Sequence, residues 1–130
     1  MNPIAQFLAD SKTFYLATTE GDQPRVRPFG AIAEWDGKTY FCCNNQKKVY
    51  HQMIANPKVE ISAMAGPKWI RLEGKVALDP RPEAQAAMIA ANPGLKNMYK
   101  PEDGLFAVFY FTEAKATVYA FNADPVEITF

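Results

Sequence analysis

The stretch RVRPFGAIAEWDGKTYFCCNNQKKVYHQMIANP, residues 25–57, decides the fold of this chain. Asp36-Gly37 is typical of a two-residue β-hairpin, because both central positions of that turn need positive φ angles. Apolar and aromatic residues on either side predict two paired strands, over 25–35 and 38–43. A helical pattern follows over 46–55 and ends at the Asn-Pro step, since a residue before proline disfavours the helical conformation. The stretch therefore predicts an antiparallel hairpin that leads directly into a short helix.

The rest of the chain predicts strands and helices of similar length. Asn2-Pro3 and Asp79-Pro80 each open a helical pattern, and runs of aromatic and β-branched residues indicate strands. These further strands are expected at 13–19, 59–65, 69–78, 105–111, 116–121 and 126–130. About eight short strands, mostly joined as hairpins, predict a mainly β fold: an antiparallel barrel with two or three peripheral helices, in one domain over residues 1–130.

Composition limits the classes of function. Apolar residues make up 48% of the chain and charged residues 22%, as in ordinary globular domains. Fourteen basic residues balance fourteen acidic ones, so no overall field attracts nucleic acid or an anionic membrane. No apolar run reaches the ~20 residues that span a bilayer, and the first residues lack a secretory leader pattern. We expect a cytoplasmic protein without disulfides, because the two cysteines are adjacent and have no other partner.

The segment LFAVFYF, residues 105–111, is apolar on both faces of its expected strand. A strand with one solvated face would alternate apolar and polar residues instead. In a chain this small, we interpret the pattern as barrel interior on one side and a partner subunit on the other. The segment therefore predicts a homodimer with a broad apolar interface.

Two lysines lie where a helix disfavours cations. If Asn45 is the N-cap, Lys47 and Lys48 occupy the second and third helical positions, beside unpaired backbone N–H groups and the positive end of the helix dipole. A phosphate would accept hydrogen bonds from those N–H groups and pair with both ammonium groups. The alternative is that both lysines are solvated, at a cost of about a few tenths of a kcal/mol.

The segment RVRPFG adds further candidates for an anion site. Arg25 and Arg27 lie on one face of the expected strand. Pro28 cannot donate a hydrogen bond to a neighbouring strand and marks an edge or a bulge, while Gly30 lets another group approach the backbone closely. Arg71, on another strand, is a third arginine that could line the same pocket. The alternative is an edge strand protected from aggregation by arginine and proline.

Other chemistry has little support in the sequence. His51 is the only histidine, so a metal site with two or more histidines is excluded, and we expect no metal. Cys42-Cys43 lacks the spacing of a zinc or iron–sulfur site. A cysteine–histidine nucleophile pair has nothing to fix its geometry, and the chain has no dinucleotide-binding glycine motif or P-loop. We therefore assign no catalytic side chain.

The run RVRPFGAIAEWDGKTYFCCNNQKKVYHQMIANPKVEI, followed by WIRLEGKV, resembles the FMN-binding split-barrel family typified by pyridoxamine 5′-phosphate oxidase. The shared pattern is an arginine-bearing strand, a short hairpin, an aromatic strand, a polar loop with basic residues, and a helix ending in Asn-Pro. It covers residues 10–80 well. The length and the VYHQMIANP helix are similar to short oxidase-like and nitroimidazole-reductase-like members.

This resemblance implies a homodimer with FMN in a cleft at the subunit interface. Arg27 would bind the phosphate or the ribityl chain, and Lys47 and Lys48 would bind the phosphate. The backbone of residues 28–30 and the Cys42-Cys43 pair would face the flavin ring. The full set of cofactor-binding residues implied by the resemblance is Arg27, Pro28, Phe29, Gly30, Cys42, Cys43, Lys47, Lys48 and Arg71.

The departures from the family pattern shape the expected function. Val49 replaces a basic residue of the biosynthetic oxidase, Cys43 replaces a hydroxyl side chain, and the C-terminal segment that shapes the pyridoxamine phosphate site is missing. We therefore expect an FMN oxidoreductase that reduces a small planar acceptor, such as a nitroaromatic or a quinone, and not a vitamin B6 oxidase. The alternatives are a non-catalytic flavin carrier, or the same fold binding the deazaflavin F420 or haem.

Overall fold

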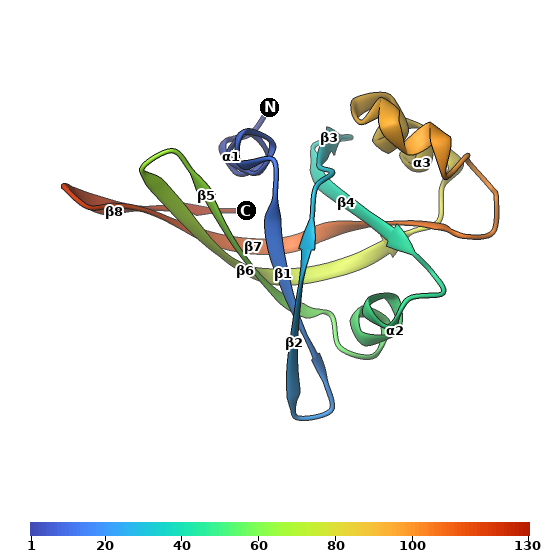
Figure 1. Ribbon diagram of the computed structural model, residues 1–130, viewed down its shortest axis with the longest axis horizontal. Coiled ribbons are helices and arrows are strands. Elements are labelled where there is room, and N and C mark those ends of the chain that lie inside the picture. The colour runs from blue at the N-terminus through green and yellow to red at the C-terminus, as the bar shows by residue number, and fades with distance from the viewer.

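The computed structural model describes residues 1–130 as eight strands, three α-helices and one 3-10 helix (Figure 1). None of the helices combines the length and the apolar character that crossing a membrane requires. The elements in chain order are α1 (Pro3–Ser11), β1 (Phe14–Glu20), β2 (Gln23–Phe29), β3 (Ala33–Trp35), β4 (Lys38–Asn44), α2 (Lys48–Ala55), β5 (Lys58–Ala65), β6 (Lys68–Asp79), α3 (Pro82–Ala91), η1 (Pro93–Asn97), β7 (Phe106–Ala120) and β8 (Ala123–Thr129).

All strand pairs are antiparallel, in the order β2-β1-β5-β6-β7-β4-β3. β7 is the longest strand: one edge pairs with β6, while β4 and β8 share the other edge. The β5–β6 and β7–β8 hairpins project to the left in Figure 1, and the β1–β2 hairpin projects downward. The predicted antiparallel β fold with peripheral helices is confirmed.

The Asp36-Gly37 hairpin is confirmed, but the strand expected before it is divided. Asp36 and Gly37 have φ angles of 52° and 71°, which match a type I′ turn. The expected strand at 25–35 consists of β2, which pairs with β1, and β3, which pairs with β4. The division lies at residues 30–32, because the chain there crosses from one end of the strand order to the other.

The strands expected at 105–111 and 116–121 form one continuous strand, β7. The residues between them, 112–115, include no glycine or proline to break the strand. Glu113, Ala114 and Lys115 continue the pairing with β6. The register of the β6–β7 pair shifts between Lys75 and Val76 of β6, which face Glu113 and Phe111 of β7. One residue of β7 is therefore left unpaired, as in a β-bulge.

The main core lies inside the curved sheet. Its twenty buried residues include residues of α1 and α2 as well as residues of the strands. α1 packs against β5, and α2 packs against β1. β2 and β4 exchange no ladder hydrogen bonds. Phe29 of β2 instead contacts Phe14 and Phe41, with ring centroids 6.0 and 5.8 Å apart. Side chains therefore close the barrel at this seam, where the backbone does not.

α3 covers the outer face of β4 and β7. Ala84 and Met88 of α3 pack on Tyr40, Phe106 and Val108 in a second, smaller core. Residues 105–111 are therefore apolar on both faces because the chain's own helix covers the second face. The interpretation that a partner subunit covers this face is wrong, and this segment gives no argument for a dimer.

Candidate functional site

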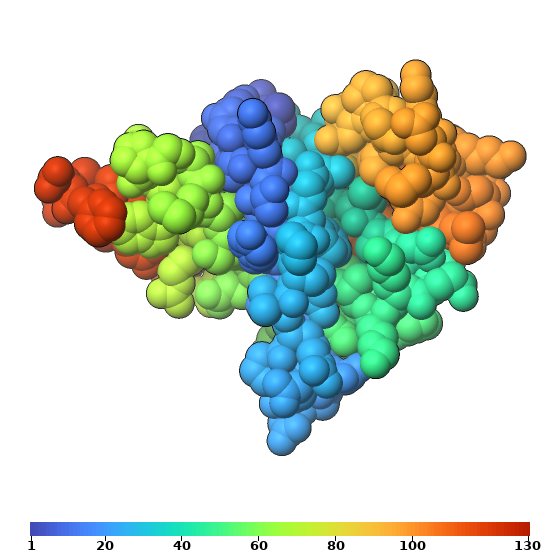
Figure 2. Space-filling model, viewed as in Figure 1, coloured from blue at the N-terminus to red at the C-terminus, as the bar shows by residue number.

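A cleft of about 800 Å³ lies along the seam between β2 and β4, a volume within the usual range for small-molecule sites. β3 pairs only with the first part of β4, so the later residues of β4 face the open seam. The surfaces of β2, α2 and the α3–η1 segment meet on the viewer's side in Figure 2. The lining residues are Arg27, Pro28, Phe29, Gly30, Ala31, Cys42, Cys43, Asn44, Gln46, Lys47, Lys48, Val49, Leu95, Met98 and Tyr99.

The cationic end of the cleft is the start of α2. The N-cap is Lys47, and its side chain caps no backbone group. Lys48 is then the first helical residue, and the N–H groups of Lys48 and Val49 have no acceptor within the chain. Both lysines are exposed, and neither takes part in an ion pair. Two free ammonium groups and two free N–H donors thus share one end of the cleft.

The prediction that Asn45 caps α2 is wrong. Asn45 instead donates through Nδ2 to the Gly104 carbonyl (2.8 Å) and through its backbone N–H to Leu105 (2.9 Å). Asn44 Oδ1 accepts from the Gln46 N–H (2.8 Å) and holds the turn before the helix. These bonds tie the end of β4 to the start of β7 and leave the start of α2 uncapped.

Arg27 lines the cleft and also braces the elements around it. Its Nη1 donates to Leu16 O (3.1 Å) and Thr18 Oγ1 (2.8 Å), and its Nη2 donates to Gln52 Oε1 (2.8 Å). Burial lowers the pKa of Arg27, yet arginine remains charged in proteins. Three of its five N–H groups are used inside the protein, so two remain for a ligand.

Cys42 and Cys43 point to opposite faces of β4, as alternation along a strand requires. Cys43 belongs to the main core and Cys42 packs against the core beneath α3. Burial raises the pKa of each thiol to about 12, and for Cys43 the charges of Lys47 and Arg27 offset only part of the effect. Both thiols are therefore protonated near neutral pH, which disfavours the cysteine nucleophile considered from the sequence.

The sequence did not identify the apolar wall of the cleft. Leu95 lies in η1, and Met98 and Tyr99 follow it directly. The Tyr99 ring stacks on Phe106 with 4.7 Å between centroids, while Met98 is 65% exposed. The signal that could have pointed to this wall was three apolar residues in an otherwise polar segment.

A family model for pyridoxamine 5′-phosphate oxidase matches residues 2–119 of this chain. The chain belongs to this family. The antiparallel split barrel expected from the sequence is therefore the fold of this family member, and its cleft lies at the split.

Solved structures of similar proteins agree with the assignment. A NimC/NimA family protein from Clostridium acetobutylicum is 50% identical, with a TM-score of 0.97 over 100% of this chain and 92% of the other. General Stress Protein 26 from Bacillus anthracis is 19% identical, with a TM-score of 0.74 over 96% and 95% of the two chains. A pyridoxamine 5′-phosphate oxidase-related, FMN binding protein from Nostoc punctiforme is 14% identical, with a TM-score of 0.64 over 100% and 98%. A search of curated proteins found no match.

Arg71 does not line the cleft of this family member. It lies on the outer face of β6, where Nη2 is 3.6 Å from Glu60 Oε2. Its neighbours there are charged and polar side chains of β5, β6 and β7 around a small depression of about 160 Å³. The structure thus brings eight of the nine predicted cofactor-binding residues to one cleft and places Arg71 elsewhere.

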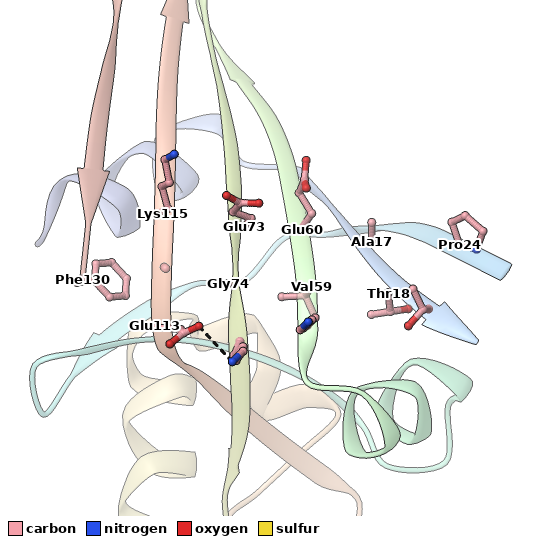
Figure 3. A pocket seen from close by; sticks show the side chains of 14 residues that line it. Ala17, Thr18, Pro24, Val59, Glu60, Glu73, Gly74, Glu113, Lys115 and Phe130 are labelled. Carbon is pink, nitrogen blue, oxygen red and sulfur yellow. Dashed lines mark ion pairs between the residues drawn. The ribbon is translucent and has the colours of Figure 1, made fainter. Parts of the chain in front are cut away.

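A larger depression of about 610 Å³ lies beside Arg71 on the same outer face (Figure 3). Its lining includes three lysines and three glutamates, and Lys75 pairs with Glu113 at 3.4 Å. Gly74 lies at its floor, where an added Cβ would be only 2.4 Å from the Glu113 carbonyl oxygen. Because its charges balance, this surface has no excess of cations for an anionic ligand, in contrast to the cleft.

Proposed function

We propose that this protein is an FMN-dependent oxidoreductase that reduces a small planar acceptor, such as a nitroaromatic or a quinone. The observation that carries the proposal is the start of α2, where Lys47, Lys48 and two unpartnered N–H groups meet at one end of the cleft. A phosphomonoester carries a charge of about −2 near neutral pH. It would satisfy both the free donors and the unpaired cations.

The other residues of the cleft fit the remainder of FMN. Arg27 keeps two N–H groups for the phosphate or the ribityl chain. The Pro28–Gly30 backbone and the half-buried Cys42 provide a weakly polar floor for a ring. Bound FMN would supply hydride and electron transfer, while the protein would bind and orient it. Membership of the pyridoxamine 5′-phosphate oxidase family, and the similarity to the Nostoc FMN binding protein, support the same ligand.

We also propose a homodimer in which the cleft lies at the subunit interface. Membership of the family supports this assembly. A cluster of one exposed and two partly exposed aromatic side chains at the tips of the β5–β6 and β7–β8 hairpins supports it physically. Phe121 is 85% exposed and contacts Trp69, which stacks on Tyr119. Exposed apolar clusters of this kind mark interaction surfaces.

The experiment is the charge reversal of both lysines, Lys47→Glu with Lys48→Glu. We expect a folded protein that purifies without flavin colour, whereas the unmodified protein carries FMN, identified by absorbance and by mass spectrometry of the released ligand. The matched control is Lys58→Glu with Lys68→Glu, which makes the same charge change at exposed lysines outside the cleft. Full flavin occupancy in the Lys47/Lys48 variant would show that the phosphate assignment is wrong.

A second measurement separates the enzyme from a flavin carrier. Bleaching of the flavin by NADH or NADPH, followed by turnover with a nitroaromatic or a quinone, is the result expected of the enzyme. A protein that holds FMN but transfers no electrons to either acceptor is a carrier. If the purified protein releases F420 or haem instead of FMN, the cleft remains the proposed cofactor site but the FMN assignment is wrong.

A further inference from the structure

We infer that the apolar wall, defined as Leu95, Met98 and Tyr99, binds the ring of the electron acceptor and selects planar apolar acceptors over hydrophilic ones. This inference rests on the proposed function and extends it to the second substrate. Two chemically distinct groups of residues line the cleft: the lysines and amides between β4 and α2, and these three residues.

The exposure of Met98 is the first observation behind the inference. A methionine side chain that is 65% exposed leaves apolar surface in contact with water, and covering that surface with an apolar ligand is favourable. In a concave site this surface favours an apolar ligand. Methionine is also flexible and polarisable, and it makes favourable contacts with aromatic rings. Because this side chain is flexible, the wall can adapt to flat acceptors of different shapes.

The wall is held in place by contacts that do not involve a ligand. Asn92, the C-cap of α3, donates through Nδ2 to Ile32 O at 2.9 Å. Asp103 Oδ1 accepts from the N–H groups of Leu105 and Phe106, both at 2.8 Å, and these bonds lower the pKa of Asp103. Tyr99 is fixed by its stacking on Phe106. A wall that is ordered beforehand loses little conformational entropy when a ring binds.

The position of the wall separates the acceptor from the phosphate. Asn45 bonds to Gly104 and Leu105, so the polar residues between β4 and α2 are joined to the loop that follows the wall. An acceptor ring on the wall and a phosphate at Lys47 and Lys48 can therefore occupy one cleft without competing for the same groups.

Methionine methyl NMR tests the inference without requiring turnover. The chain has five methionines, and isotope-labelled methyl groups give one signal each. We expect menadione, an apolar planar quinone, to shift the Met98 signal saturably in both the flavin-loaded and the flavin-free protein. Met64, which is 61% exposed on β5 and outside the cleft, is the internal control and should not move.

A substitution supplies the second readout. Met98→Glu should weaken menadione binding by about tenfold or more, because the carboxylate opposes an apolar ring. It should leave FMN occupancy unchanged. After anaerobic photoreduction of the bound flavin, the variant should be reoxidised more slowly by menadione, but at an unchanged rate by molecular oxygen, a small uncharged acceptor that needs no ring site. Ile54→Glu, at a side chain that is 53% exposed and outside the cleft, should change none of these values.

Two outcomes would overturn the inference. The first is a Met98 signal that FMN alone shifts and that menadione does not shift further, since the wall would then hold the cofactor ring. The second is an equal effect of Met98→Glu on both acceptors or on neither. Failure of the proposed function is distinguishable, because it appears as a lack of FMN binding, while the flavin-free titration still reports on the wall.

Discussion

Two helices of this protein have a basic N-cap residue, but only one of these two charges is paired with a carboxylate. The N-cap is Lys47 in α2 and Arg81 in α3, and neither side chain caps the backbone. Lys47 has no ion-pair partner. Arg81 is bound to Asp79 through two nitrogens, with its Nη2 2.8 Å from Oδ2 and its Nε 3.0 Å from Oδ1.

The difference lies in what surrounds each cation. Asp79 is only 3% exposed, and its Oδ2 also accepts from the Tyr40 hydroxyl at 2.6 Å. Arg81 further lies over the Trp35 ring, 4.8 Å from its centroid, and 3.4 Å from Asp36. A cation at the positive end of a helix is unfavourable, and here the protein's own carboxylates offset that cost. At α2 no carboxylate forms an ion pair with Lys47 or Lys48, which leaves both ammonium groups available for an anionic ligand.

The largest effect is expected when the internal partner is removed. Asp79→Ala leaves the buried Tyr40 hydroxyl without an acceptor and Arg81 without its carboxylate, so we expect a loss of about 3 kcal/mol in the free energy of unfolding. Urea unfolding measures it. The control is Asp36→Asn, which removes only exposed pairings and should cost about 1 kcal/mol or less. Equal losses in the two variants would show that the paired site does not stabilise α3.

An intermediate effect is expected from acid. The hydrogen bonds from Arg81 and Tyr40 lower the pKa of Asp79 from 3.8 to about 2, although burial opposes them. Because the folded-state pKa is depressed, the stabilisation is fully present above the unfolded pKa. It is lost as the pH falls from about 4 to about 2, and it amounts to about 2 kcal/mol. Urea unfolding across this window should show a steeper loss for the unmodified protein than for Asp79→Asn. Parallel pH profiles would contradict the assignment.

The smallest effect compares the two N-caps directly. Lys47→Asp supplies a capping carboxylate, so we expect the flavin-free protein to gain about 1 kcal/mol while losing affinity for inorganic phosphate. Arg81→Asp supplies the same cap but removes the partner of Asp79 and adds a like charge beside it, so stability should fall. Thermal unfolding and phosphate titration measure both variants. If both variants change the stability in the same direction, the contrast between the two N-caps is wrong.

Local signals in the sequence predicted much of the fold. The Asp36-Gly37 turn, the Asn2 cap of α1 and the Asn-Pro end of α2 were predicted correctly because each depends on the steric and hydrogen-bonding preferences of adjacent residues. The division between β2 and β3 and the continuity of β7 were missed. Both are set by pairing with strands distant in the chain, which no local pattern reports.

The candidate site divides in the same way. By itself, the sequence determined that two lysines lie at the start of a helix and that a strand carrying arginines precedes that helix. Both features depend only on residues that are close together in the chain. Only the tertiary structure decided that Arg81 is neutralised while Lys47 is not, and that Leu95, Met98 and Tyr99 line the same cleft as the lysines. Asp79 and Tyr40 are 39 positions apart. Such contacts depend on how the sheet brings distant segments together, and the chemistry of the site depends on them.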